Sequence, residues 1–351
     1  MRFIHMADVH LGCIPDGRSE WGAKRASELW ETFRDALEDA SRMKADLVLI
    51  AGDLFHNPPG INELRELNYL FRSYPDLCFA LIAGNHDCAY EGSAWLDFEF
   101  ARNVAFLSDS RCECVRFPGL GCEIYGFSYD RRDIPEARYD RIRPDENDYF
   151  HILLAHGGDA SHIPIRPQAL RDSGFDYIAL GHIHKPTVLI PEKAIYSGAL
   201  SPIDAGDEGP HGYIFAETFG HSVRTEFIRK APREYVTLTV EAAEEDTFLA
   251  IRDRAAEAVK ERGEENIYRL VISGQRDPGM YIDKETLLGC GMILDVTDRT
   301  VPAFHMEELK ERFRGQLIGR YIESFEGRKT EEVQQKALQY GLEALLGSMK
   351  D

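Results

Sequence analysis

The sequence predicts an α/β protein with a largely parallel, helix-covered sheet over roughly the first 220 residues, followed by a smaller α/β region. Two observations support this fold class. Short, fully apolar runs alternate with stretches in which apolar residues recur at helical spacing. Such runs are typical of strands buried on both faces of a parallel sheet. At 351 residues, 44% apolar and 29% charged, the chain is long enough for two domains with ample cores.

The elements of the first region follow in order. A short apolar strand is expected at 3–7. An amphipathic helix follows from about 19 to 44, where apolar residues recur on one face: Ala26, Leu29, Trp30, Phe33, Leu37 and Ala40. A helix around 64–71 separates two apolar strands. Those strands and the later ones are expected at 47–51, 78–83, 104–107, 123–128, 150–155 and 177–180.

A polar segment with a proline, at 228–234, ends this region. Beyond it, the pattern predicts strands at 235–240, 267–272 and 292–296, a helix at 246–262, and a terminal helix at 331–346. We therefore expect a main domain over 1–230, an accessory domain over 231–330 and a C-terminal helix within 331–351. The second region holds one histidine, His305, and no cluster of metal-type residues, so it is interpreted as accessory.

Composition points to a cytoplasmic protein without a membrane partner. No stretch approaches the roughly 18 consecutive apolar residues of a membrane span, and the N-terminus runs directly into a strand, as in a chain without a signal peptide. The seven cysteines include no CxxC pair, which favours free thiols in a reducing compartment. Cys112 and Cys114 fit ordinary alternating strand positions.

The net charge of −19 is unusual for a protein that grips nucleic acid through its phosphates. Either metals and a few local cations hold the substrate, or a partner supplies a basic surface. One loop is basic and carries Tyr129 and Tyr139, which could stack on bases. Acidic residues outnumber its arginines, however, so a salt-bridged surface loop is favoured. The arginines are Arg131, Arg132, Arg138, Arg141 and Arg143.

Five short motifs contain half of the twelve histidines. They are Asp8-Val9-His10, Gly52-Asp53-Leu54-Phe55-His56, Gly84-Asn85-His86-Asp87, His156-Gly157 and Gly181-His182-Ile183-His184. Almost every candidate ligand lies just past the C-terminal end of a predicted strand, which is the edge of an α/β sheet where ligands bind. The glycines at 52, 84 and 181 permit the tight turns that this requires.

These residue types suit two-metal hydrolysis of a phosphoester, in which two cations about 3.5–4 Å apart neutralise the phosphate and a bridging hydroxide attacks in line. Asp8 and His10 can point to one side, and Asp53 is the natural bridging carboxylate. Asn85 offers a neutral amide oxygen. His156, His182 and His184 complete two sites. Imidazole and carboxylate ligands suit manganese, iron or zinc, and argue against a structural zinc site.

Three further residues are expected beside the metals. His86 follows Asn85 directly and is a candidate acid or cation for the phosphate and leaving group. Asp87 could fix the tautomer of His86, or could be a surface carboxylate. His56 could reach the substrate. The remaining histidines are interpreted as ordinary core or surface residues: His5, His151, His162, His211, His221 and His305.

At these motifs the sequence resembles the calcineurin-like metallophosphoesterase superfamily over roughly residues 1–220, and within it the SbcD-like DNA repair nuclease family. Four features narrow the resemblance: Leu11-Gly12 after the first motif, Leu54-Phe55-His56 in the second, Lys185-Pro186 after the last, and the later segments 196–199 and 209–212. It implies a four-layer α/β/β/α sandwich and a small α/β capping domain.

The resemblance also implies residue roles. One metal would take Asp8, His10, Asp53 and His184, and the other Asp53, Asn85, His156 and His182. His86 would be catalytic, and manganese the usual metal. The implied activity is DNA cleavage, as a 3′–5′ double-strand exonuclease and a single-strand or hairpin endonuclease.

The implied partners are DNA, an SMC-like ATPase subunit (SbcC-like) and a second copy, with dimerisation through the helical regions 63–73 and 88–102. The tail after 330 is short for ATPase docking, and its apolar stripe could pack on its own domain instead. That stripe comprises Val333, Ala337, Leu338, Leu342 and Leu345.

Two alternative functions remain. The same ligands serve hydrolases of small phosphoesters or cyclic nucleotides, which the acidic charge favours, whereas the motif extensions and the capping region favour DNA. A metal-free scaffold that has lost the reaction predicts missing ligands, and none of the expected positions is missing.

Overall fold

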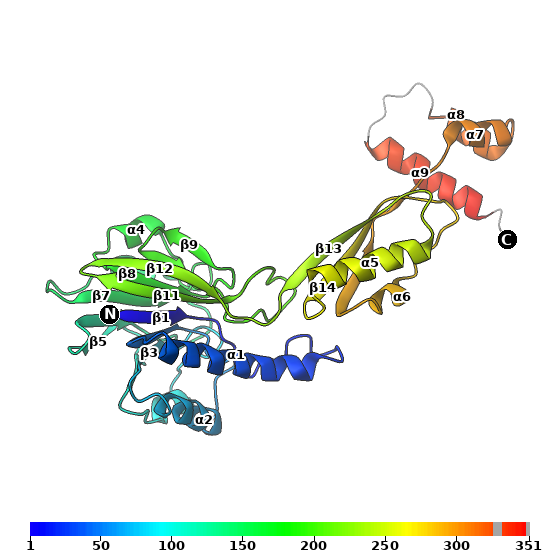
Figure 1. The fold of residues 1–351 in the computed structure, drawn as a ribbon. Coiled ribbons are helices and arrows are strands. Elements are labelled where there is room, and N and C mark those ends of the chain that lie inside the picture. The colour runs from blue at the N-terminus through cyan, green and yellow to red at the C-terminus, as the bar shows by residue number, and fades with distance from the viewer. Residues whose placement is uncertain (326–331, 349–351) are drawn as a thin grey trace. The chain divides into compact units, whose positions relative to one another are not determined.

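The computed structural model describes residues 1–325 and 332–348. Internal contacts divide the chain into two compact units, 1–235 and 236–351. Within the described ranges, the first unit contains two six-stranded sheets and the second a four-stranded sheet (Figure 1). In the same ranges, no helix has the length and apolar character that crossing a membrane requires.

The first sheet has the strand order β12-β11-β1-β2-β3-β4. Its strands are β1 (Arg2–Met6), β2 (Leu47–Ala51), β3 (Cys78–Ile82), β4 (Val104–Phe106), β11 (Gly212–Phe219) and β12 (Ser222–Arg229). The strands from β1 to β4 run parallel, with Ile4 opposite Val48 and Val48 opposite Phe79. β11 pairs antiparallel with β1, and β12 pairs antiparallel with β11. The carboxyl ends of β1, β2 and β3 therefore share one edge.

The second sheet has the order β5-β6-β7-β8-β10-β9. Its strands are β5 (Glu113–Phe117), β6 (Cys122–Gly126), β7 (Phe150–His156), β8 (Tyr177–Gly181), β9 (Thr187–Ile190) and β10 (Ala194–Tyr196). The central strands β6, β7, β8 and β10 are parallel, and the edge strands β5 and β9 are antiparallel to their neighbours. The last residues of β7 and β8 are His156 and Gly181, which both belong to predicted motifs.

Three apolar layers hold the first unit together. Helices α1 (Gly22–Arg42) and α2 (Ile61–Arg72) cover the outer face of the first sheet, where Phe33 and Phe71 are buried. The inner faces of the two sheets share a second layer. On the outer face of the second sheet lie α4 (Pro167–Arg171) and the 3₁₀ turn η1 (Arg138–Arg141). This succession of layers confirms the predicted α/β/β/α sandwich.

The second unit is also mixed α/β. Its sheet contains β13 (Tyr235–Ala242), β14 (Ile267–Arg276), β15 (Ile293–Asp298) and β16 (Val301–Pro302). Tyr235, the first residue of β13, is the last residue of the first unit. Helix α5 (Phe248–Arg262) buries Ile251, Ala255 and Val259 against it. The remaining helices are α6 (Lys284–Leu288), α7 (Met306–Arg312), α8 (Leu317–Glu323) and α9 (Glu332–Gly347).

The apolar stripe of the terminal helix is divided between two environments. Leu338, Leu342 and Leu345 pack in a cluster with residues of α7 and α8, whereas Val333 is 75% exposed. Residue 331, where the helix was expected to begin, lies outside the described residues. The alternative that the stripe packs on its own unit therefore accounts for all three of its leucines.

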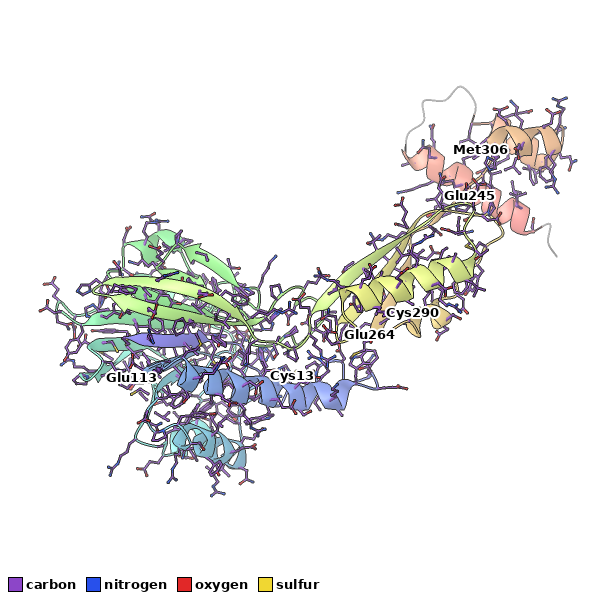
Figure 2. The ribbon with its side chains drawn as sticks, in the orientation of Figure 1. Cys13, Glu113, Glu245, Glu264, Cys290 and Met306 are labelled. Atoms are coloured by element: carbon purple, nitrogen blue, oxygen red, sulfur yellow. The ribbon has the colours of Figure 1, made fainter. Side chains whose placement is uncertain are left out.

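Two further predictions, a helical region at 88–102 and free cysteines, can be compared with the structure. The helical region expected at 88–102 is helical only in α3 (Ala94–Asp97), because Trp95 and the neighbouring phenylalanines fill the space beside α2 as an irregular aromatic cluster. All seven cysteines are free thiols, as expected. Two of them, Cys13 and Cys290, are labelled in Figure 2 and belong to different units.

Candidate metal centre

The seven predicted metal ligands come together where the carboxyl ends of strands from both sheets meet. Asp8 and His10 follow β1, Asp53 follows β2, and Asn85 follows β3. The second sheet contributes the histidines at the end of β7 and after β8, namely His156, His182 and His184. All seven are buried or half-buried. The cluster thus forms at the sheet edge that the motif positions predict.

The first half of the cluster contains Asp8, His10, Asp53 and His184. The Nε2 atoms of His10 and His184 lie 3.1 Å apart, and His10 Nε2 lies 3.9 Å from Asp53 Oδ2. The ligand atoms of Asp8, His10 and His184 all lie within 4.8 Å of one another. Asp8 accepts the backbone N–H of His182 on both carboxylate oxygens, at 3.0 and 2.9 Å, which fixes its orientation.

The second half contains Asp53, Asn85, His156 and His182. His156 Nε2 lies 2.9 Å from Asn85 Oδ1 and 3.4 Å from Asp53 Oδ2. His182 Nδ1 lies 3.1 Å from the same Asn85 oxygen. Asp53 is therefore adjacent to His10 on one side and His156 on the other, as a bridging carboxylate must be.

Unusual backbone conformations aim these side chains. Asp8, His10, Asp53 and His182 all have positive φ angles, of 51°, 51°, 49° and 96°. Non-glycine residues rarely adopt this region, and such strain concentrates at functional sites. The four residues are spread over three strand ends, so the strain belongs to the cluster and not to one turn.

Two glycines let the sheet edges approach this closely. A Cβ on Gly84 would lie 2.2 Å from Asp53 Oδ1, and a Cβ on Gly181 would lie 2.1 Å from the carbonyl oxygen of Ala51. Neither distance is possible for a real side chain, so any larger residue would push Asp53 or the end of β2 away. The glycines thus provide close approach, in addition to the turns expected from the sequence.

The donor set fits a bound cation. His156 Nδ1 lies 2.9 Å from the carbonyl oxygen of Ala51, so it carries the ring hydrogen and leaves Nε2 as an acceptor. That acceptor faces the Asn85 and Asp53 oxygens, which are acceptors too. Acceptors this close repel one another unless a proton or a metal ion lies between them. Within the described residues, His10 Nδ1 is also buried without a hydrogen-bond partner.

The pKa shifts of the cluster residues also favour a bound cation. Burial alone would lower the pKa of His156, but the adjacent Asp53 carboxylate raises it to about 9. For Asp53, burial is outweighed by the neighbouring histidines, chiefly His156, and its pKa is lowered. His10, in contrast, has its pKa lowered to about 3, mainly by burial. The cavity therefore stabilises positive charge between its ligands, while His10 stays neutral and able to ligate.

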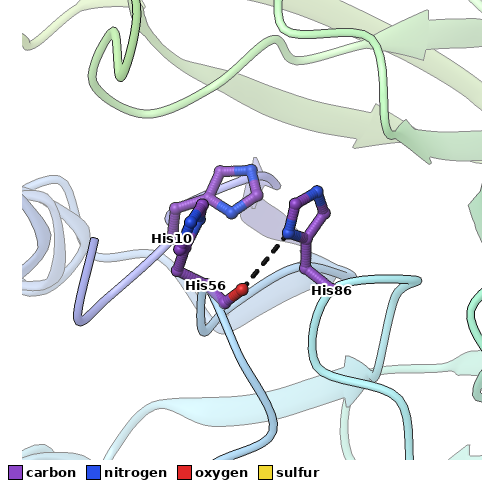
Figure 3. Close-up of side chains that lie close together, drawn as sticks. All are labelled: His10, His56 and His86. Carbon is purple, nitrogen blue, oxygen red and sulfur yellow. Dashed lines mark hydrogen bonds between the residues drawn. The ribbon is translucent and has the colours of Figure 1, made fainter. Parts of the chain in front are cut away.

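The structure also places His86 and His56 at the cluster, with their rings and that of His10 side by side (Figure 3). The backbone N–H of His86 donates to Asp53 Oδ1 at 2.8 Å, and its Nδ1 lies 3.2 Å from the carbonyl oxygen of His56. Because a carbonyl oxygen can only accept, the hydrogen of this contact lies on His86 Nδ1.

Among the hydrogen bonds of the described residues, none joins the Asp87 carboxylate to the His86 ring, in contrast to one of the two predictions from the sequence, and Asp87 is not a surface carboxylate either. Its carboxylate is fully buried and accepts the backbone N–H groups of Gly84 and Phe55 at 2.7 and 3.0 Å. These buried donors need an acceptor, and Asp87 supplies it. Burial raises the pKa of Asp87 to about 7.

Sequence reasoning missed residues that contact the cluster from outside the motifs. Asp159 lies against His182 and Asp207 against His184. The Tyr129 hydroxyl donates to the carbonyl oxygen of His156, and the Tyr139 hydroxyl accepts the His156 N–H. Both tyrosines are buried, so they do not stack on bases.

In the basic loop that carries these tyrosines, Arg131 pairs with Asp130 and Glu136, as the salt-bridged reading expects. Asp159 follows a glycine pair, which is the only local signal that marks these outer residues in the sequence.

A cluster of carboxylates, imidazoles and an amide, at the edge where the parallel strands of two mixed sheets end, is typical of a metal-dependent hydrolase of phosphoesters. The family model of the calcineurin-like phosphoesterases matches residues 1–186. The chain belongs to this family, whose members use divalent metals.

Curated relatives agree with this assignment. The Bacillus subtilis metallophosphoesterase YhaO is 30% identical over 297 residues, which cover 78% of this chain and 72% of that protein. The DNA double-strand break repair protein Mre11 of Methanopyrus kandleri is 27% identical over 78% of this chain and 63% of its own length. Mre11 of Saccharolobus solfataricus is 23% identical over 93% of this chain and 91% of its own length.

Proposed function

We propose that this chain is a two-metal phosphodiesterase that cleaves DNA, with manganese as the metal, of the SbcD-like kind. The observation that carries the proposal is the convergence of Asp53 with six further ligand-type residues from two sheets. The likeness to proteins named for DNA double-strand break repair supports DNA as the substrate. We infer 3′–5′ exonuclease action on duplexes and endonuclease action on single strands and hairpins.

The residues divide the work as follows. Asp8, His10, Asp53 and His184 hold one ion, and Asp53, Asn85, His156 and His182 hold the other. Two bound divalent ions supply a deprotonated water and neutralise the charge of the phosphate.

His86 lies outside the ligand set. Because its Nδ1 hydrogen goes to the His56 carbonyl oxygen, it is the doubly protonated ring that donates a proton or hydrogen bond from Nε2 to the leaving oxygen. His56, whose ring centroid lies 5.2 Å from that of His86, contacts the substrate.

We assign the nuclease reaction to residues 1–230, an accessory role to 231–330, and a C-terminal helix to 331–351. The partners in this proposal are DNA, an SbcC-like ATPase subunit and a second copy of the chain. A partner subunit would provide the basic surface that a chain of net charge −19 does not.

A second candidate function is hydrolysis of small phosphoesters or cyclic nucleotides. The observation that favours it is the pairing of Arg131 with two carboxylates, together with the acidic charge of the whole chain. A small substrate needs only the metals and the adjacent histidines, whereas a DNA backbone gains affinity from free cations.

The two functions are distinguished by cleavage of a labelled duplex and a hairpin DNA, alongside p-nitrophenyl phosphate and its bis ester, with added manganese. Asp53→Ala is the control, because it removes the carboxylate common to both ion sites. DNA cleavage that is lost in this control supports the nuclease. Turnover of the small esters alone would replace it with the second function.

A further inference from the structure

Two carboxylates outside the motifs contact the far nitrogens of two proposed ligand histidines. Asp159 Oδ2 lies 2.7 Å from His182 Nε2, and the Asp207 oxygens lie 3.0 and 3.1 Å from His184 Nδ1. Each contact joins residues 23 positions apart. A carboxylate can only accept a hydrogen, so each fixes which ring nitrogen is protonated.

The two rings carry their hydrogens on different nitrogens, but in each ring the nitrogen that faces the cluster is the unprotonated one. With its hydrogen on Nε2, His182 presents an unprotonated Nδ1 toward Asn85. With its hydrogen on Nδ1, His184 presents an unprotonated Nε2 toward His10. In both cases the nitrogen that faces the cluster keeps the lone pair that a metal needs.

We propose that Asp159 and Asp207 are positioning residues, one for each ion, which hold His182 and His184 in the tautomers that bind metal. The inference rests on the proposed function. It assigns Asp159 to the ion held by Asn85, His156 and His182. It assigns Asp207 to the ion held by Asp8, His10 and His184.

The two carboxylates are held in different ways. Asp207 is nearly buried, at 8% exposure of its side chain, and also accepts the backbone N–H of Ile203 at 2.9 Å. Asp159 is 47% exposed and shares its Oδ2 with His162 Nδ1 at 2.8 Å. Its other oxygen accepts the N–H groups of Ser161 and His162, which holds the loop in shape.

This geometry predicts an unusual order of effects for substitutions at Asp159. In Asp159→Asn, the amide oxygen can still accept the backbone N–H groups of Ser161 and His162. The NH₂ group of the asparagine then faces His182 Nε2, which must accept from it, so the ring hydrogen of His182 moves to Nδ1. In Asp159→Ala, water replaces the carboxylate and either tautomer can form. The isosteric asparagine variant should therefore bind metal more weakly than the alanine variant.

The test is calorimetric titration of the metal-free full-length protein with Mn²⁺, without substrate. We expect two sites in the wild type. In Asp159→Asn, one site weakens about 10- to 100-fold, and in Asp159→Ala it weakens less. Asp207→Asn should weaken the other site. Asp133→Asn and Asp204→Asn are the control variants. Asp133 lies in the loop between β6 and η1 and contacts His162, and Asp204 lies in the same loop as Asp207 but accepts the backbone N–H of Gly206.

Ring-nitrogen NMR of the metal-free protein supplies a second measurement, with His182 expected to carry its hydrogen on Nε2 in the wild type and on Nδ1 in Asp159→Asn. The inference would be overturned if Asp159→Asn and Asp159→Ala bound Mn²⁺ equally well, or if one variant weakened Mn²⁺ binding equally at both sites. Either result would leave the two-metal function intact. A wild type that binds no Mn²⁺ would overturn the proposed function itself.

Discussion

At the scale of single residues, the candidate site depends on close contacts that leave no room for additional atoms. Asp53 is the clearest case, because it lies against His10, His156 and the His86 N–H at once. Its neighbour Gly84 has no side chain, and a Cβ there would overlap the Asp53 carboxylate. The position of Asp53, the proposed bridging residue, thus depends on a glycine in a different motif.

Gly84→Ala should therefore weaken Mn²⁺ binding at both ion sites by at least about tenfold, since Asp53 is shared between them. Gly119→Ala is the control, because a Cβ there meets nothing within 4 Å. Isothermal titration of both variants gives the affinities. Unchanged binding in Gly84→Ala would show that Asp53 is not held where the structure has it.

His86→Ala should lower kcat by about 10²- to 10⁴-fold, the range typical of a lost general acid or base. The two bound Mn²⁺ ions should remain, since the ring of His86 lies outside the ligand set. Steady-state kinetics and metal titration on the same preparation test both statements. A kcat close to that of the wild type would remove the role assigned to His86.

At the same scale, the sequence predicts which residues converge at the cluster better than it predicts the residues that contact them from outside. Each of the seven residues lies in a short motif that follows a strand, so the adjacent sequence predicts where it lies in the fold. Asp159 and Asp207 act through histidines 23 residues away, and no local pattern marks that pairing. Asp87 shows the converse: it adjoins His86 in the sequence, but the turn directs its carboxylate beneath the loop to buried backbone N–H groups.

At the scale of elements, buried ion pairs hold α1 in place within the first unit. Glu28 accepts from Arg25 at 2.9 Å and from Arg233 at 2.8 Å. All three side chains are buried. Because a buried charge that loses its partner keeps its full desolvation cost, this cluster is sensitive to removal of one member.

Glu28→Gln should lower the free energy of unfolding of the first unit by about 3 kcal/mol, because two buried guanidinium groups lose their carboxylate. Urea unfolding followed by tryptophan fluorescence measures this, and Trp21, Trp30 and Trp95 all lie in the first unit. Glu66→Gln, which breaks the exposed pair with Arg34, should be indistinguishable from the wild type. Equal effects of the two substitutions would contradict a buried network.

The elements themselves are predicted unevenly. Parallel central strands such as β2 and β7 are continuous apolar runs, and their positions match the expectation. The edge strands β9 and β12 are half-exposed, with mixed composition, and the sequence pattern does not separate them from loops.

At the scale of the whole molecule, one buried histidine makes stability depend on pH. His5 is fully buried beside Tyr177, with its Nδ1 2.9 Å from the tyrosine hydroxyl. Burial lowers the pKa of His5 from 6.5 to about 3. The unfolded chain therefore binds a proton between these pH values that the folded chain does not, so folding loses stability as pH falls below about 6.5.

His5→Gln removes this proton and should flatten the pH dependence. Between pH 7 and pH 5 the wild type should lose about 2 kcal/mol more of its unfolding free energy than the variant. Urea unfolding at each pH in metal-free buffer measures the difference. Parallel pH profiles would mean that His5 titrates normally in the folded protein.

The central claim is that seven residues from two sheets hold two metal ions that share Asp53. The most direct measurement is a crystal structure of the protein soaked in Mn²⁺, with anomalous scattering recorded. The claim predicts two anomalous peaks about 3.5–4 Å apart, one beside His10 and His184 and one beside Asn85 and His156, with Asp53 between them. A single peak, or peaks away from Asp53, would contradict it.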